Sequence, residues 1–229
     1  MDAAVNLQPR LIEVAVPNHP VGAVLVLHGG ASRRENMTVS PTQLSVLRMI
    51  PIARRIARVG RSELAVFRLL NSARGWDTQH TPIHDARWAL DQIAERLSKP
   101  LPTCLVGHSL GGRAALLAAN RPEVQSAVAL APWVYPTDLP TRLAGRQILI
   151  VHGTHDRIAR PERSLALAQN LRAEARVSYI SINGGKHAMI KHHRRFDGLA
   201  ADFATATLLG TPATGAIARI QKGEALIQL

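Results

Sequence analysis

The sequence predicts an α/β protein in which helices cover both faces of a mostly parallel, twisted sheet. Short apolar segments with strand character alternate along the chain with longer segments whose apolar residues recur at helical spacing. Glycine-rich turns follow several of the apolar segments, where a strand would pass into a loop or a helix. Strands that alternate with helices are joined by crossover connections, which make the strands parallel.

The elements can be placed in chain order by these patterns. Strands are expected over residues 11–16, 23–28, 63–70, 103–106, 126–130, 147–152 and 177–182. Helices are expected over residues 44–59, 83–97, 113–119, 162–173 and 188–208. Pro51 falls inside the first of these helices and predicts a kink or a division there, because proline has no N–H to donate.

Length and composition favour one globular enzyme-sized domain. The chain has 229 residues and is 46% hydrophobic, enough for one sizeable core. Its single cysteine, Cys104, excludes an intrachain disulfide, lies in an apolar strand and fits a reducing compartment. The first ten residues lack the pattern of a secretory signal, and no apolar stretch is long enough to span a bilayer. We therefore expect a cytoplasmic protein without a membrane span.

The chain is strongly basic, with 28 Lys and Arg against 16 Asp and Glu and a formal net charge of +12. The densest basic run is 191–195. A solvated cationic surface and attraction of anionic partners are both compatible with this excess. No nucleic-acid motif accompanies it, and aromatic residues that could stack on bases make up only 3% of the chain, so no nucleic acid is expected. No spacing typical of a metal site occurs, and we expect neither metal nor cofactor.

The most informative motif is the run 107–112, Gly-His-Ser-Leu-Gly-Gly. It lies between an apolar strand and a helix, which is the context of a nucleophile elbow. This sharp turn exposes a serine and requires very small residues two positions before and after it, here Gly107 and Gly111. The motif therefore predicts Ser109 as a nucleophile. The competing interpretation is an ordinary glycine-bearing turn with an incidental serine.

A serine nucleophile needs a base to take its proton and an acid to orient that base. Asp156 and His187 each follow an expected strand, and the carboxyl ends of parallel strands meet at one edge of a sheet. Asp156 also suits a helix N-cap, and Asp138, in a turn-like stretch, is the alternative acid. The other candidate bases are His152, His155, His192 and His193.

Further segments complete the predicted site. The turn after residues 23–28 can offer the N–H of Gly30 or Ala31, together with that of Leu110, to a developing oxyanion. The residues expected to line or border the substrate pocket are His28, His108, Trp76, Trp133 and Met189. Only residues 131–146 separate two strands where a cap domain would be inserted, so we expect an open site without a large cap. Such a site favours small or mid-sized soluble acyl substrates.

In four motifs, taken together and in this order along the chain, the sequence resembles the α/β-hydrolase superfamily, and in particular a small, lidless, esterase-like bacterial branch. The motifs are His28-Gly29-Gly30, the run 107–112, the run 152–156 and Gly184-Gly185-Lys186-His187. The resemblance covers residues 11–209 and implies a Ser109–His187–Asp156 triad that cleaves an ester-like acyl bond, with a small-molecule ester or thioester as substrate.

Carboxylesterase activity is the first expectation from this resemblance. Thioesterase, lactonase and peptidase activity, or acyl transfer, would use the same residues, and a non-catalytic binding protein on the same fold is the remaining alternative. We expect residues 1–210 to form the catalytic domain. Residues 211–229 are expected to form a C-terminal tail that docks on the body, mediates self-association or is loosely held.

Overall fold

An eight-stranded sheet forms the centre of the molecule, with the strand order β1-β3-β2-β4-β5-β6-β7-β8. The structure, a computed structural model, describes residues 8–31 and 37–229. Every neighbouring pair of strands is parallel except β1 and β3. The strands are β1 (Arg10–Ala15), β2 (Gly22–Leu27), β3 (Leu64–Leu70), β4 (Thr103–His108), β5 (Val124–Leu130), β6 (Gln147–Gly153), β7 (Arg176–Ile182) and β8 (Leu226–Gln228).

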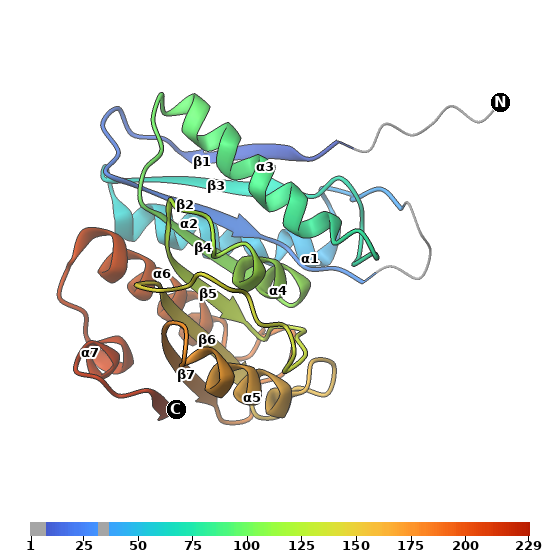
Figure 1. The fold of residues 1–229 in the computed structure, drawn as a ribbon, viewed down its shortest axis with the longest axis vertical. Helices are drawn as coiled ribbons and strands as arrows, with labels where there is room; N and C mark the ends of the chain where they lie inside the picture. Colours follow the sequence, from blue (N-terminus) through green and yellow to red (C-terminus); the bar gives the residue numbers. More distant parts are fainter. Residues whose placement is uncertain (1–7, 32–36) are drawn as a thin grey trace.

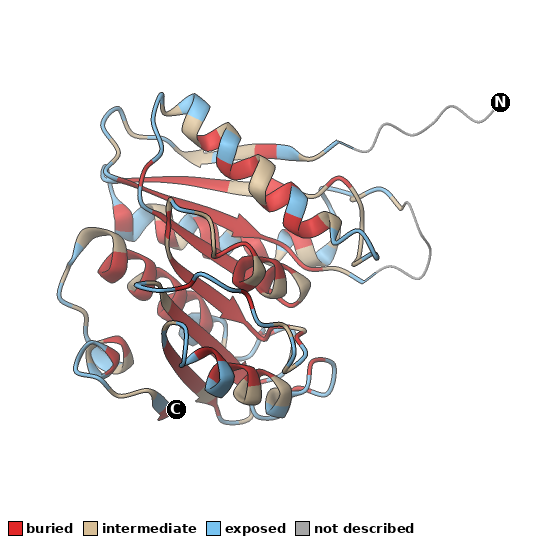
Figure 2. Ribbon diagram, in the orientation of Figure 1, coloured by how far each residue is buried: buried red, intermediate tan, exposed pale blue. Residues whose placement is uncertain are grey.

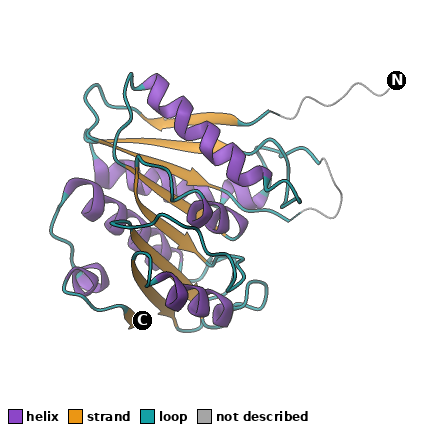
Figure 3. Cartoon of the chain, in the orientation of Figure 1, coloured by secondary structure: helices purple, strands orange, loops and turns teal. Residues whose placement is uncertain are grey.

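Helices cover both faces of this sheet, which confirms the predicted fold class (Figure 1, Figure 3). One face carries α3 (Thr81–Arg96), α4 (Leu110–Leu117) and α5 (Pro161–Leu171). The other carries α1 (Leu44–Leu47), α2 (Met49–Gly60) and α6 (His193–Leu209), with α7 (Gly215–Gln221) beside α6. None of the helices in the described residues is long and apolar enough to cross a bilayer.

The core consists of two apolar layers, one on each side of the sheet. Every residue of β2 and of β4 is buried, and Figure 2 shows this burial along the central strands. Strands buried on both faces are read from sequence as continuous apolar runs rather than as alternating patterns. Cys104 lies in one of these layers, completely buried, as its apolar strand predicted.

Two expected helix boundaries are wrong. The segment 44–59 does divide in two, but at Arg48 rather than at Pro51. Pro51 lies in the first turn of α2, where its missing N–H would have no helical acceptor in any case. The last large helix begins at His193 instead of 188, so residues 188–192 remain a loop.

The C-terminal segment 211–229 is docked on the body. Its last strand, β8, runs parallel to β7 with Ile227 opposite Ile180, and α7 buries Ile217 and Ile220. All four isoleucines belong to the apolar layer that α2 and α6 share with the sheet. Between β5 and β6, residues 131–146 are fully described and contain neither helix nor strand, so no cap is inserted there.

The docked C-terminal strand predicts a measurable contribution to stability. Ile227→Ala removes a buried side chain and should lower the free energy of unfolding by about 2–4 kcal/mol. Leu226→Ala, in the same strand but with its side chain half exposed, should change it by less than about 0.5 kcal/mol. Urea unfolding of both variants tests this, and equal losses would show that β8 does not pack as described.

Candidate functional site

Ser109 lies at the carboxyl edge of the sheet and is the single residue between β4 and α4. Its backbone has φ 57° and ψ −120°, which is strained for any residue other than glycine. A side chain at Gly107 would collide with the Gly111 carbonyl, and one at Gly111 would collide with the Leu27 carbonyl oxygen. The two glycines therefore make this sharp turn possible, and the predicted elbow is present.

The loops that carry Asp156 and His187 are bound to each other. The Thr154 N–H donates to the Ile182 carbonyl at 3.0 Å, and the His155 N–H donates to the Gly185 carbonyl at 2.9 Å. The two backbones approach so closely that a side chain at Gly153 would collide with the backbone of Gly185. Because β6 and β7 are neighbours, the acid and the histidine are brought together by sheet pairing and by these loop contacts.

The structure brings the three predicted side chains into one hydrogen-bonded line. His187 Nε2 lies 3.0 Å from Ser109 Oγ, and His187 Nδ1 lies 2.8 Å from Asp156 Oδ2. In the neutral imidazole, Nδ1–H donates to the carboxylate, so Nε2 is free to accept the serine proton. The side chain of Asp156 is fully buried, whereas that of His187 is 13% exposed toward the cleft. This is the arrangement of nucleophile, base and orienting acid.

Asp138, the alternative acid, does not reach this line. It accepts hydrogen bonds from Arg113 Nη2 at 2.7 Å and from the Tyr135 N–H at 2.9 Å. Among the rival bases, His155 and His193 are exposed, and His192 is the N-cap residue of α6.

The Asp156 carboxylate is held in its ionised form by the groups around it. Burial alone would raise its pKa, but hydrogen bonds from His152, His187 and the Ile158 N–H outweigh burial and hold the pKa well below its usual range. Its Oδ1 accepts from the N–H groups of Ile158 at 2.8 Å and Ala159 at 3.0 Å. One carboxylate oxygen therefore accepts backbone N–H groups of the loop after β6, as the side chain of a helix N-cap does, while the other is the partner of His187.

His152 is a part of the site that sequence reasoning missed. The sequence named it as a rival to His187 at the end of an expected strand, and it is completely buried behind the acid. Its Nε2 lies 3.1 Å from Asp156 Oδ2 and 3.0 Å from the Ala159 carbonyl oxygen, both acceptors, so Nε2 carries the proton. Its Nδ1 lies 2.7 Å from Ser164 Oγ. The Asp156 carboxylate is thus held by two histidines, and the four-residue spacing of the run 152–156 was the signal for the second.

His108 supports His187 from the other side. Its Nε2–H donates to the His187 carbonyl oxygen at 2.9 Å, and the two rings lie 5.0 Å apart. Burial, together with the neighbouring His187, lowers the pKa of His108 to about 3. His108 is therefore neutral at ordinary pH and ties the elbow to the loop that carries His187.

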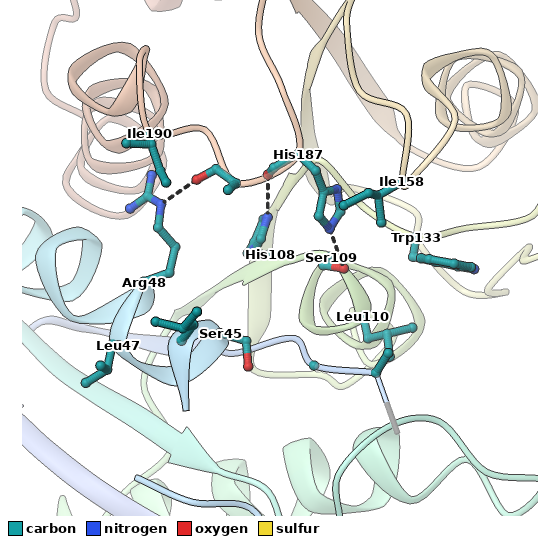
Figure 4. Close-up of a pocket in the computed structure, with 14 residues that line it drawn as sticks. Ser45, Leu47, Arg48, His108, Ser109, Leu110, Trp133, Ile158, His187 and Ile190 are labelled. Atoms are coloured by element: carbon teal, nitrogen blue, oxygen red, sulfur yellow. Dashed lines mark hydrogen bonds between the residues drawn. The ribbon is translucent and has the colours of Figure 1, made fainter. Parts of the chain in front are cut away.

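A cleft of about 570 Å³ opens beside Ser109 (Figure 4). Most of its wall is apolar and comes from Leu44, Leu47, Leu110, Trp133, Ile158 and Ile190. Arg48 also lines it, but its charge is paired with Asp197 at 2.7 Å, and its Nε–H donates to the Ala188 carbonyl. Figure 4 shows Trp133, Ile158 and Leu110 on one side of Ser109 and Arg48, Leu47 and Ile190 on the other. The cleft therefore suits an uncharged, apolar group.

The predicted pocket and oxyanion residues divide into two groups. Those that line the cleft are Gly30, Ala31, His108, Leu110 and Trp133. Leu110 is the first residue of α4, so its N–H has no acceptor within the helix. Gly30 has φ 129°, and a side chain there would collide with Gln43.

The other three expected pocket residues, His28, Trp76 and Met189, do not line the cleft. His28 donates from Nδ1 to the Gly29 carbonyl and accepts the Asn71 N–H at Nε2, so it joins the ends of β2 and β3. The Arg113 guanidinium lies over Trp76, with its Cζ 4.1 Å from the centre of the tryptophan ring. Met189 is buried in the core, although its two neighbours in the chain, Ala188 and Ile190, line the cleft.

The contact between His152 and Asp156 predicts a change in the pKa of the carboxyl group. His152→Leu removes one of the hydrogen bonds that lower this pKa, so the pKa of Asp156 should rise toward its usual range in an NMR titration. His152→Gln, whose amide can donate in the same direction, should restore part of the lowering. Ser164→Ala, which leaves the contact with Asp156 intact, is the control. An unchanged pKa in His152→Leu would show that the contact has no electrostatic effect.

The neutral state of His108 predicts a pH-dependent stability. Its folded pKa of about 3 lies below the ordinary value of 6.5, so its contribution is complete above pH 6.5 and is lost as the pH falls toward 3. Replacing it in His108→Gln should reduce the slope of unfolding free energy against pH, between about pH 6 and pH 4, by up to about 1.4 kcal/mol per pH unit. Urea unfolding at several pH values measures the slope, with His193→Gln as an exposed control. A slope identical to that of the parent protein would contradict the buried neutral ring.

Comparison with known proteins agrees with this fold. A family model described as PETase, PET hydrolase-like, matches residues 89–200, the part of the chain that contains Ser109, Asp156 and His187. No curated protein matches the sequence.

Solved structures provide the wider comparison. An α/β serine hydrolase homologue from Coxiella burnetii has 16% identity and a TM-score of 0.63 over 88% of this chain and 93% of its own. Est1E from Butyrivibrio proteoclasticus has 15% identity and a TM-score of 0.63 over 88% and 94%. XC6422 from Xanthomonas campestris, an α/β serine hydrolase without a lid, has 19% identity and a TM-score of 0.62 over 90% and 89%. The chain therefore has the fold of these α/β hydrolases.

Proposed function

We propose that this protein is a serine hydrolase that cleaves carboxylic esters, with Ser109 as nucleophile, His187 as base and Asp156 as the orienting acid. The observation that carries the proposal is the hydrogen-bonded line from Ser109 Oγ through His187 to Asp156. The serine end of this line opens on an apolar cleft. Such a line is costly to assemble, because it requires a strained serine and a buried carboxylate at adjoining loops.

In the proposed reaction, Ser109 Oγ attacks the ester carbonyl carbon while His187 Nε2 takes the hydroxyl proton. Asp156 stays ionised and stabilises the imidazolium that forms. The oxyanion accepts hydrogen bonds from the N–H of Leu110 and from that of Gly30 or Ala31, each contributing about 2.7–4 kcal/mol to the lowering of the barrier. The carbon–oxygen bond then breaks, and the leaving alcohol receives the proton from His187.

The second half of the reaction releases the acyl group. A water molecule gives its proton to His187 Nε2 and attacks the acyl carbon bound to Ser109. The second tetrahedral intermediate collapses, Ser109 Oγ recovers its proton, and the carboxylic acid leaves. This sequence uses only the chain's own side chains and N–H groups.

The cleft favours esters whose acyl or aryl part is apolar. Its wall is mostly aliphatic apart from Trp133, and Arg48, the one cation among the described residues that line it, is already paired with Asp197. The short loop between β5 and β6 inserts no cap over the cleft, which suits small and mid-sized substrates. Est1E, one of the structural relatives, has been solved with ferulic acid bound, so aryl esters belong among the first substrates to test. Thioesters and lactones would use the same groups.

Labelling and substitution test the proposed roles. A fluorophosphonate probe should form an adduct on Ser109 in the parent protein and none in Ser109→Ala, as measured by mass spectrometry. Asp156→Asn should lower kcat for p-nitrophenyl esters by about 10³–10⁴-fold, because the imidazole would lose its orienting partner. Asp138→Asn, which changes a partner of Arg113 instead, is the matched control and should change kcat little.

Two outcomes would contradict the assignment. The absence of any adduct on folded parent protein would favour the non-catalytic alternative. Equal losses in the two aspartate variants would remove Asp156 from its proposed role.

A further inference from the structure

The positive charge of the chain is concentrated in three segments that each contribute residues to the wall of the cleft. Residues 37–62, 157–161 and 186–196 contain eleven Lys and Arg and no Asp or Glu. The remainder of the chain is nearly balanced, with 17 basic and 16 acidic residues, so these segments account for almost the whole net charge of +12. Nine of the eleven cationic side chains are exposed. This distribution differs from the even spread that a general solvated surface would have.

The same three segments expose large apolar side chains around the mouth of the cleft. Leu44 is 83% exposed, Ile190 72%, Ile158 58% and Leu47 41%, and all four line the cleft. We call these four residues the apolar rim. They come from α1, from the loop after β6 and from the loop before α6. Figure 4 shows Leu47, Ile158 and Ile190 on the two sides of Ser109. Scattered exposed hydrophobic residues are ordinary, but a group around one opening marks an interaction surface.

Exposed cations lie next to the apolar rim and extend away from it along one face. Arg157 precedes Ile158, and Lys191 follows Ile190. Arg194 and Arg195 occupy the first turn of α6, which packs against α2 on the same face of the sheet as α1 (Figure 1). The outer side of α2 adds further exposed arginines, among them Arg54. The result is an apolar centre with a cationic border on one side of the molecule.

We propose that the protein docks through this apolar rim and its cationic border on an anionic lipid surface. The aliphatic rim can enter the region between headgroups and acyl chains, while Lys and Arg contact the lipid phosphates. A nucleic acid fits less well, because base stacking needs aromatic side chains and the rim has none. If the proposed esterase function also holds, docking brings the mouth of the cleft against ester groups held at that surface.

Vesicle binding tests the docking separately from catalysis. The full-length parent protein and Ser109→Ala should both co-float with vesicles that contain phosphatidylglycerol and only weakly with pure phosphatidylcholine. Binding should decrease as salt is raised, because exposed charges are screened. Since Ser109→Ala cannot act as the proposed nucleophile, its binding does not depend on the proposed function. A failure of fluorophosphonate labelling with retained vesicle binding would therefore overturn the enzyme and leave the docking intact.

Substitutions assign the binding to this surface. The double variant Lys191→Glu/Arg194→Glu should lower the partition coefficient onto phosphatidylglycerol vesicles by about thirty-fold or more. The matched double variant Lys99→Glu/Lys222→Glu makes the same change of charge on exposed residues just before the amino ends of β4 and β8, opposite the cleft mouth, and should bind like the parent. Circular dichroism verifies that all variants fold. Leu44→Ser/Ile190→Ser should reduce the part of the binding that persists in high salt.

Several results would overturn the proposal. These are equal binding to vesicles with and without phosphatidylglycerol, equal losses in the two charge variants, or displacement of the protein from vesicles by a single-stranded oligonucleotide. The last would identify a nucleic acid as the partner of the cationic border.

Discussion

The site depends on one constraint, which is that the fully buried carboxylate of Asp156 must be satisfied. A buried charge is costly unless it is hydrogen-bonded, and four donors meet this one, from His187, His152 and the N–H groups of Ile158 and Ala159. Each donor fixes something else. The N–H groups fix the loop after β6, and His187 is held with Nδ1 toward the acid. Its Nε2 is therefore directed toward Ser109.

The parallel sheet makes this constraint possible. Neighbouring parallel strands end at one edge, so β4, β6 and β7 deliver the serine, the acid and the histidine to the same place. The contact between Gly153 and Gly185 brings two of the loops close together, and His108 bonds the third to them. Because the connection between β5 and β6 is short and carries no helix, it places no cap over the apolar cleft, and the exposed rim and cationic border face outward together.

The sequence predicted the fold class, and the structure brings together the serine, the acid and the histidine that it singled out, because strand-then-turn patterns indicate which loops lie at the carboxyl edge of a parallel sheet. It was insufficient where a residue's role depends on packing. The four-residue spacing places His152 near the acid but does not show that its ring contacts the carboxylate, and Trp76, an expected pocket residue, stacks on Arg113 instead. The loop at 188–192 has helical composition, so the exposure of Ile190 at the cleft was visible only in three dimensions.

The most direct measurement of the central claim is a crystal structure of the protein after reaction with a phosphonate that mimics the tetrahedral intermediate. We predict phosphorus bonded to Ser109 Oγ and His187 Nε2 within hydrogen-bond distance of an ester oxygen. The phosphonyl oxygen should accept hydrogen bonds from the N–H of Leu110 and from that of Gly30 or Ala31. Phosphorus on another residue, or a phosphonyl oxygen directed away from those N–H groups, would contradict the claim.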